Sequence, residues 1–319
     1  MVGRSRKHLA LRLRGFVVSS VVSMCLSGIA CGVAAEPVGN KIRYGQGRQL
    51  STLEDQRITE SSGLACSRRN EGVFWTHNDS GDKPRVYAFN RKGENLASFT
   101  VRGAKARDWE DMASFTIGQK HYLLLADIGD NKRKRKSCTL YIIEEPKLDT
   151  RKRNVRSQTQ VVQTIEFTYE DGPGDCESVA VDPIGRTILL VTKSPKRTVY
   201  QLPLPKKTAE KTKPLTAKPI ANLMLFWTTG MDVSPDGRRA VVLTYAHARQ
   251  YVRKDGEPWA DAFARKPQTI FLPPRPQGES ICYGADGKTL YLTSEKLPTP
   301  LIEVPVIKKE QPPAREKVR

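Results

Sequence analysis

Histidine is scarce in this sequence. Of the 319 residues only four are histidine (His8, His77, His121 and His247), and none shows the paired spacing that zinc ligands need. A Gly-x-Ser-x-Gly nucleophile motif and a glycine-rich phosphate loop ending in Lys-Ser or Lys-Thr are absent as well. A zinc enzyme is therefore not indicated, and serine hydrolases and P-loop enzymes are disfavoured.

Acidic residues are outnumbered. The chain has 34 Asp and Glu against 53 Lys and Arg, a formal net charge of +19. Basic runs stand at 132–136, 151–153 and 206–213, but no aromatic residues are interleaved in them for base stacking, which disfavours a nucleic-acid partner. The charge favours a small phosphorylated substrate or an acidic surface polymer. We expect a monomer with no membrane contact beyond the N-terminal segment.

That N-terminal segment has the composition of a secretory signal. Basic residues such as Arg4 and Arg6 precede an apolar run from Phe16, and small residues end it at Ala35. We therefore predict a signal peptide at 1–35, a polar lead-in at 36–47, and a secreted or periplasmic protein. An uncleaved membrane anchor and a lipoprotein attached through Cys31 are the alternatives.

A short pattern recurs along the rest of the chain. Successive copies begin 48, 67, 52 and 50 residues apart, a period typical of propeller blades. The five copies are Ser62-Gly63-Leu64-Ala65, Glu110-Asp111-Met112-Ala113, Glu177-Ser178-Val179-Ala180, Thr229-Gly230-Met231-Asp232 and Glu279-Ser280-Ile281-Cys282.

Each copy opens a unit of short β-patterned runs separated by turn residues. The last unit lacks a fourth run, and the run 48–58 has no unit of its own, so we expect it to complete the last blade. This predicts an all-β fold, a five-bladed β-propeller over 48–306 closed by an N-terminal strand, and a charged disordered tail at 307–319. Six blades are the alternative because the second unit is longer, but we interpret its surplus, 147–160, as loop.

In such a fold the first residue of each copy lies near the start of a channel strand, so five oxygen-bearing side chains should converge. Three of them are glutamates, which would repel one another unless a cation neutralised them. Hard oxygen ligands in an irregular array suit Ca²⁺. Pairing with arginine, shared protons and channel water are the alternatives. The predicted metal ligands are Ser62, Glu110, Glu177, Thr229 and Glu279.

The same topology places two cysteines on the face that carries these residues. Cys138 begins the third strand of one blade, and Cys176 lies in the loop that enters the next blade. We expect a disulfide between them, with all four later cysteines free as the alternative. Cys66 and Cys282 fall on channel strands and are expected as buried thiols.

The ring order Ser, Glu, Glu, Thr, Glu resembles that of the calcium-activated nucleotidases, or apyrases, five-bladed propellers with a central Ca²⁺ held by Ser, Glu, Glu, Ser and Glu. Thr229 would be the one departure. Two segments also resemble sequence motifs of a group of exported bacterial propellers, with a looser similarity to esterase-like phytases. They are Asp108-Trp109-Glu110-Asp111-Met112-Ala113 and Gly129-Asp130-Asn131.

The resemblance implies a Ca²⁺-dependent hydrolase of phosphate esters or anhydrides. The catalytic candidates are Asp79, Asp127, Asp130 and Glu295, and the candidate substrate contacts are His77, Asn131 and Lys193. Asp and Asn beside Gly are also ordinary turn residues, so several of these acids have a structural alternative. The alternative function is a non-catalytic propeller that binds a protein, glycan or polyanionic surface ligand, with Ca²⁺ in a structural role.

Overall fold

Strands dominate the part of the chain that the computed structural model describes, which is residues 41–193, 195–206 and 214–307. These residues form 20 strands and one short helix, α1 (Trp259–Ala264), so the expected all-β class is confirmed. The predicted signal peptide at 1–35 and nearly all of the predicted tail lie outside the described residues. Within those residues no helix is both long and apolar enough to cross a lipid bilayer.

The strands pair antiparallel in five sets of four, and parallel pairs between outer strands join the first three sets into one 12-stranded sheet. The first set contains β2 (Ser61–Cys66), β3 (Val73–Asn78), β4 (Arg85–Asn90) and β5 (Asn95–Arg102). The second contains β6 (Trp109–Ile117), β7 (Lys120–Asp127), β8 (Cys138–Glu144) and β9 (Val155–Tyr169). The third contains β10 (Cys176–Asp182), β11 (Thr187–Thr192), β12 (Thr198–Pro203) and β13 (Leu215–Asn222).

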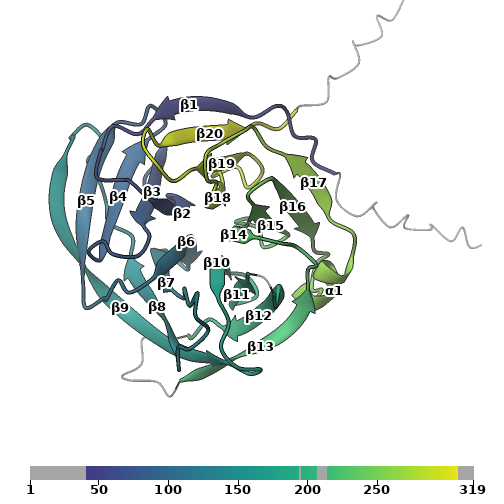
Figure 1. Cartoon of the computed structure of the whole chain (residues 1–319). Helices are drawn as coiled ribbons and strands as arrows, with labels where there is room; N and C mark the ends of the chain where they lie inside the picture. Colours follow the sequence, from purple (N-terminus) through teal and green to yellow (C-terminus); the bar gives the residue numbers. More distant parts are fainter. Residues whose placement is uncertain (1–40, 194, 207–213, 308–319) are drawn as a thin grey trace, which may run out of the picture. The chain divides into compact units, whose positions relative to one another are not determined.

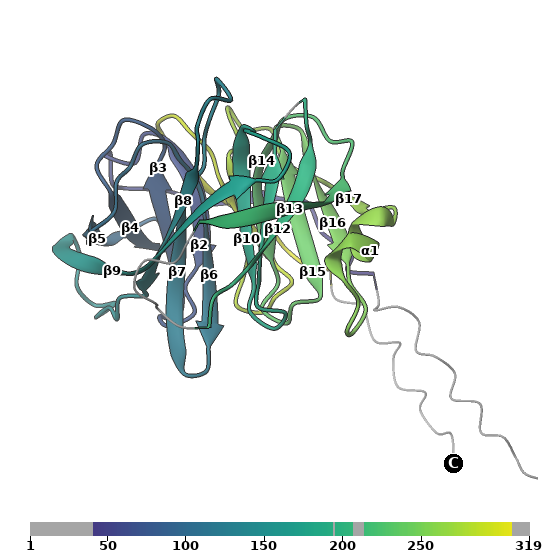
Figure 2. The ribbon, with the colours of Figure 1, turned by 90° about the horizontal axis from the view of Figure 1, so that it is seen from below.

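The fourth set contains β14 (Thr228–Val233), β15 (Arg239–Thr244), β16 (His247–Val252) and β17 (Gln268–Phe271). The fifth joins β18 (Ser280–Tyr283), β19 (Leu290–Thr293) and β20 (Pro300–Val304) with β1 (Arg48–Thr52) from the start of the chain. Figure 1 shows the five sets arranged around a common centre, and Figure 2 shows the same ribbon from below.

The fifth set combines both ends of the described chain. Arg48 of β1 stands opposite Glu303 of β20, and its guanidinium lies 2.8 Å from the Glu303 carboxylate. Arg91 reaches the same carboxylate at 2.7 Å from the neighbouring set. The N-terminal run therefore pairs where the sequence predicted, although the strand ends at Thr52 and the following residues lie outside it.

The first strand of each set lies at the centre. β2, β6, β10, β14 and β18 each contact the next one, and β18 contacts β2. β2, β10, β14 and β18 are buried along their whole length, and β6 over most of it. Five hydrophobic clusters fill the spaces between neighbouring sets, and their large members include Trp75, Trp109 and Trp259. Burial of such side chains from both sheets fixes the inner strands in place.

Strand β9 is longer than the sequence suggested. Its 15 residues begin at Val155, and residues Val155 to Gln160, which we interpreted as loop, pair in parallel with β5. Most side chains of this stretch are exposed, so it has no apolar alternation to reveal a strand. Main-chain hydrogen bonds to the edge of the first set hold it instead.

The expected disulfide between Cys138 and Cys176 is wrong, because all four cysteines of the described part are free and buried. Both thiols lie in one hydrophobic cluster, where each faces a main-chain carbonyl. Cys138 Sγ is 3.8 Å from the oxygen of Ile128, and Cys176 Sγ is 3.3 Å from that of Val191. Burial raises the pKa of the Cys138 thiol to about 12, so it carries little thiolate.

Candidate metal centre

A shared backbone irregularity presents the predicted ring residues. Where each of four inner strands pairs with its neighbour, one extra residue interrupts the register near the start of the inner strand. A β-bulge of this kind redirects the side chain of its extra residue. The extra residues are Ser62, Glu110, Glu177 and Thr229, and the fifth ring residue, Glu279, directly precedes β18. We call the end of the inner strands that carries these five residues the mouth.

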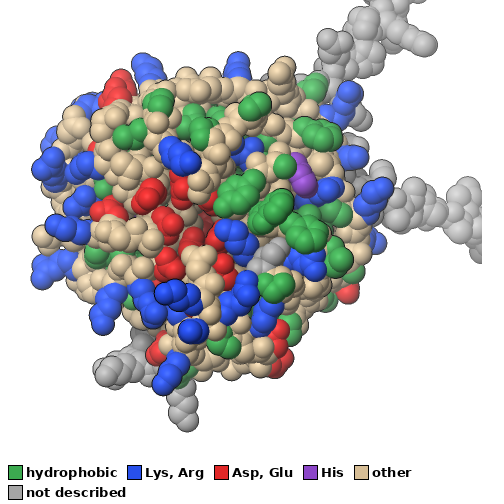
Figure 3. Space-filling view, viewed as in Figure 1, with side chains coloured by type: hydrophobic (Ala, Val, Ile, Leu, Met, Phe, Trp, Pro, Cys, Tyr) green, Lys and Arg blue, Asp and Glu red, His purple; other side chains and the backbone are tan. Residues whose placement is uncertain are grey.

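Carboxylates crowd the mouth. Asp79 follows β3, Asp108 precedes β6, and one oxygen from each lies within 4.8 Å of one oxygen of Glu110 and of the other. Glu110 is buried, and the two aspartates are partly buried. Figure 3 shows acidic side chains gathered at the centre of the face, with basic side chains around them. The sequence analysis did not count Asp108 among the metal ligands.

The crowding shifts the titration of these groups. Burial raises the pKa of Asp79 to about 6, and Asp108, Glu60 and Glu279 add to the effect. The pKa of Glu110 is raised well above its usual value by burial first and then by the carboxylates of Asp79, Glu177, Asp108 and Asp175. Each carboxylate therefore makes ionisation of its neighbours more costly, as expected for a site that needs a cation.

Lys193 is a basic residue in direct contact with the ring. Its ammonium forms an ion pair with Glu177 and lies 3.4 Å from the hydroxyl of Tyr245. Burial still raises the pKa of Glu177 to about 8, although Lys193 acts to lower it. Lys193 therefore lies at the mouth as predicted, where it offsets part of the negative charge.

Two further residues complete this side of the mouth. Glu279 accepts a hydrogen bond of 3.0 Å from Gln277, and burial raises the pKa of Glu295 to about 7, with Glu279 and Asp79 adding to the rise. Glu295 is thus close enough to Glu279 for their charges to interact.

The two hydroxyl groups of the ring donate hydrogen bonds to main-chain carbonyl groups. Ser62 donates to the carbonyl oxygen of Glu110 at 2.6 Å, and Thr229 donates to that of Gly278 at 2.9 Å. Each hydroxyl bridges to the next inner segment and keeps its oxygen lone pairs for another partner.

A buried carboxylate next to the ring, that of Asp111, connects the inner strands. The fully buried carboxylate of Asp111 accepts hydrogen bonds from the main-chain amides of Met112, Val179 and Met231, at 2.8, 2.9 and 3.1 Å. These residues lie on β6, β10 and β14, so one side chain connects three inner strands. Nothing in the sequence pattern distinguished the role of Asp111 from that of Glu110.

Two predicted catalytic acids have structural partners in the loop after β7. Asp127 forms a buried ion pair with Arg135 at 2.7 Å, and Asp130 accepts the main-chain amides of Lys134 and Arg135 at 2.9 and 2.8 Å. Arg135 also donates to the carbonyl of Gly129 at 2.9 Å. These bonds shape the loop, so both acids have the partners that a structural role requires. Burial of Arg135 was not expected from a run of five basic residues.

The remaining predicted substrate contacts are separated. His77 is completely buried, with Nδ1 2.9 Å from the carbonyl of Asn78 and its ring edge-on to Trp109. Such a side chain packs the fold behind the ring and does not face solvent. Asn131 is exposed on the loop after β7, where it stays available to a ligand.

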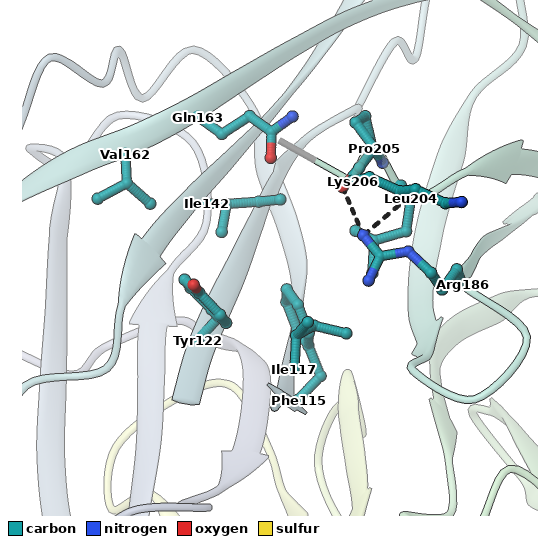
Figure 4. A pocket seen from close by; sticks show the side chains of 10 residues that line it. All are labelled: Phe115, Ile117, Tyr122, Ile142, Val162, Gln163, Arg186, Leu204, Pro205 and Lys206. Carbon is teal, nitrogen blue, oxygen red and sulfur yellow. Dashed lines mark hydrogen bonds between the residues drawn. The ribbon is translucent and has the colours of Figure 1, made fainter. Parts of the chain in front are cut away.

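One of the pockets in the described part of the chain lies away from the mouth and has a volume of about 70 Å³ (Figure 4). Its lining comes from β6 to β9, with Phe115, Tyr122 and Ile142 among the side chains, and from Arg186, Leu204, Pro205 and Lys206. It is at the opposite ends of the strands from the mouth, next to the β6–β7 hairpin. This volume is small beside that of typical substrate pockets, and the lining is mostly apolar.

No family model matches the chain, and no curated protein does. The resemblance to calcium-activated nucleotidases therefore depends on the ring residues alone. Among solved structures, a gluconolactonase from Xanthomonas campestris has 10% identity and a TM-score of 0.43, with 83% of this chain and 88% of that chain covered. Raptor from Chaetomium thermophilum has 11% identity and a TM-score of 0.41, with 79% and 20% covered. At these values neither similarity indicates a function for this chain.

Proposed function

We propose that the protein is an exported five-bladed β-propeller that holds Ca²⁺ at its mouth and hydrolyses phosphate esters or anhydrides there. The five sets of four strands, their ring of inner strands and the β1–β20 pairing support this blade count and the closure by the N-terminal strand. Six blades would need a further set, and the surplus of the second unit is used by β9.

The observation that carries the metal proposal is the group of Asp79, Asp108 and Glu110, whose oxygens lie within 4.8 Å of one another. Only oxygen ligands are present, which suits a hard cation. The backbone leaves space for them: a Cβ at Gly129 would lie 2.1 Å from Glu110 Oε1 and 2.5 Å from Asp108 Oδ2. The residues therefore fit Ca²⁺, with the predicted ring residues Glu177, Glu279, Ser62 and Thr229 as further proposed ligands.

When bound, Ca²⁺ would neutralise these carboxylates and polarise a phosphoryl oxygen. The chain's own residues would do the rest. Lys193, paired with Glu177 at the rim, would attract the anionic group, and exposed Asn131 could donate a hydrogen bond to it. Glu295 would accept a proton from the attacking water, since its carboxylate is only partly buried at the mouth. Asp127 and Asp130 would hold the loop around Gly129.

The test is a melting experiment on the purified protein in chelator, with Ca²⁺ or Mg²⁺ added back. An ion that binds only the folded state stabilises it by about 2.7 kcal/mol when the free ion concentration is a hundred times the Kd. We expect Ca²⁺ to raise the Tm of the natural protein and to leave the Tm of Glu110→Gln unchanged. Glu144→Gln is the matched control, because this glutamate is half-exposed on β8 and pairs with Arg69.

Hydrolysis is then measured with 4-nitrophenyl phosphate as an ester and pyrophosphate as an anhydride. Turnover that needs Ca²⁺ and is lost in Glu295→Gln would support the reaction. A Ca²⁺-dependent Tm without turnover of either compound would leave the metal site and contradict the hydrolase. A Tm that does not change when Ca²⁺ is added would contradict both the metal site and the Ca²⁺-dependent hydrolase.

A further inference from the structure

A row of large apolar side chains is exposed beside the mouth, in the loop between β13 and β14. Met224, Phe226 and Trp227 are 67%, 57% and 61% exposed. The alternating residues Leu223 and Leu225 are buried in the hydrophobic cluster between the third and fourth sets. The loop is thus fixed from below while it presents three apolar side chains to solvent. Figure 3 shows hydrophobic side chains next to the acidic centre on this face.

Hydrogen bonds hold this presentation. The amide of Leu223 donates to the carbonyl of Arg197 at 3.1 Å, and the side-chain amide of Asn222 donates to the carbonyl of Lys196 at 2.9 Å. Met224 and Trp227 have φ angles of 51° and 55°. Bulky residues adopt this left-handed conformation only when their surroundings impose it, and such strain is concentrated at functional sites.

Basic side chains accompany the apolar ones. The guanidinium of Arg197 lies 4.5 Å from the ring centre of Phe226, and the ammonium of Lys193 lies 5.6 Å from that of Tyr245, which is 37% exposed. By the strand order, the other loops on this face include those after β7 and β19, which carry the exposed Lys132, Lys134, Lys136 and Lys296. Trp, Phe and Tyr mixed with Lys and Arg are the composition that settles at a lipid headgroup boundary.

We infer that loop 223–227 inserts into an anionic lipid surface and brings the mouth against it. Met224, Phe226 and Trp227 would enter the headgroup boundary, and the basic side chains of the surrounding loops would contact anionic headgroups. This occupant is favoured over a soluble polymer because Met224 and Phe226 offer only apolar contacts. It departs from the sequence-based expectation that the protein makes no membrane contact beyond its N-terminal segment.

The inference does not depend on hydrolysis or on Ca²⁺. The acidic mouth lies next to the loop, so a cation bound there would reduce its repulsion of anionic headgroups. Ca²⁺ would therefore change only the affinity for the lipid surface, and Phe226 and Trp227 would be needed for binding with or without it.

Tryptophan fluorescence gives a local test. Of the four tryptophans, Trp75, Trp109 and Trp259 are at most 2% exposed, so a change of emission on binding reports Trp227. The chain from Val38 onward contains every described hydrophobic cluster and avoids the apolar N-terminal segment, which could bind lipid itself. It is mixed with vesicles of phosphatidylglycerol and phosphatidylcholine, and with vesicles of phosphatidylcholine alone.

We expect a blue shift of the emission and sedimentation with the anionic vesicles, and weaker binding to phosphatidylcholine alone. The double variant Phe226→Ser, Trp227→Ser should lose about tenfold or more in sedimentation affinity, because both apolar contacts are removed. Ile184→Ser is the matched control, since Ile184 is 71% exposed in the β10–β11 loop at the other end of the strands. Because the replaced residues are all exposed, each variant should keep the natural Tm.

Two results would overturn the inference. Binding that the double variant retains in full would show that loop 223–227 does not contact the lipid. Dextran sulfate that shifts the Trp227 emission as strongly as the vesicles do would show that the loop binds a soluble polyanion.

Discussion

At the scale of single residues, the main chain approaches the carboxylates of the mouth closely. Gly129 is the clearest case, because its main chain lies against Glu110 and Asp108 without a side chain between them. The loop that carries it is fixed by Arg135, which bonds both the Gly129 carbonyl and Asp127. An ion that uses these two carboxylates would therefore meet a rigid wall on one side, which preorganises the ligands.

Gly129→Ala tests this wall. The new methyl group would overlap Glu110 Oε1, so the carboxylate must move, and we expect the affinity for Ca²⁺ to fall at least about tenfold. The backbone of Gly129 is not left-handed, so the change should lower the Tm in chelator only slightly. Isothermal titration with Ca²⁺ measures the affinity.

Gly118→Ala is the matched control. Its φ of 60° makes alanine costly, but it stands in the β6–β7 hairpin with nothing near its Cβ. It should lower the Tm and keep the Ca²⁺ affinity. An unchanged affinity in Gly129→Ala would remove Glu110 and Asp108 from the proposed ligands.

At this scale the sequence indicated which residues approach the mouth but not how they are used. The repeat placed Glu110 and Glu177 correctly at one end of the inner strands, because strand order alone brings equivalent positions together. It could not separate Asp79, which stands in the acidic group, from Asp127, which pairs with Arg135. Both are aspartates at the end of the second strand of a set, and only the three-dimensional structure distinguishes them.

Elements were predictable where side chains alternate or are uniformly apolar. The inner strands β2, β10 and β14 are buried throughout and were found from the recurring pattern that opens each unit. The sequence did not predict the first part of β9, because main-chain hydrogen bonds to β5 stabilise it. Its side chains, such as Arg156, Ser157 and Gln158, show no alternation of apolar and polar residues that would indicate a strand. Strand β1 was found by a different argument, from the missing partner in the last unit.

Removal of β1 tests whether this strand completes the fifth set. A chain that begins at Leu53 would leave the edge of β20 unpaired and expose its main-chain groups. We expect a Tm lower by roughly 10 °C or more, since several kcal/mol of pairing and packing would be lost. We also expect association of the chains, measured by light scattering.

A chain that begins at Gly47 is the control. It keeps β1 and loses only the preceding residues, including the isolated bridge between Tyr44 and Val306. The two chains should differ clearly in Tm. Equal melting and equal size of the two would contradict the closure by β1.

At the scale of the whole molecule, charge is divided. The chain has a net charge of +19, yet the carboxylates of Asp79, Glu110 and Glu177 gather at the centre of a single face. Composition indicated an anionic partner but could not show that the basic side chains surround an acidic centre (Figure 3). The two signs together are expected for a site that binds a cation and is approached by an anion.

The pH dependence of stability should reveal the acidic centre. Burial raises the pKa values of Asp79, Glu295 and Glu177 to about 6, 7 and 8, above their unfolded values of 3.8, 4.5 and 4.5. Between those limits the folded state binds more protons than the unfolded state, so stability is lost as the pH rises. Burial lowers the pKa values of His77 and His247 below their unfolded value of 6.5, so these two residues act in the opposite direction below that pH. Without metal we therefore expect the Tm to fall most clearly from about pH 6.5 to about pH 8.

Other carboxylates do not obscure this trend. Asp149 and Glu257 have pKa values lowered to about 2 by their arginine partners, so their contribution is complete above about pH 4.5. Saturating Ca²⁺ should flatten or reverse the fall, because the ion binds the deprotonated mouth and is displaced by protons at low pH. Melting curves in chelator and in Ca²⁺ across this range measure both slopes. A Tm in chelator that rises towards pH 8 would mean that the mouth carboxylates are already neutralised by the chain's own basic groups, and the need for a cation would disappear.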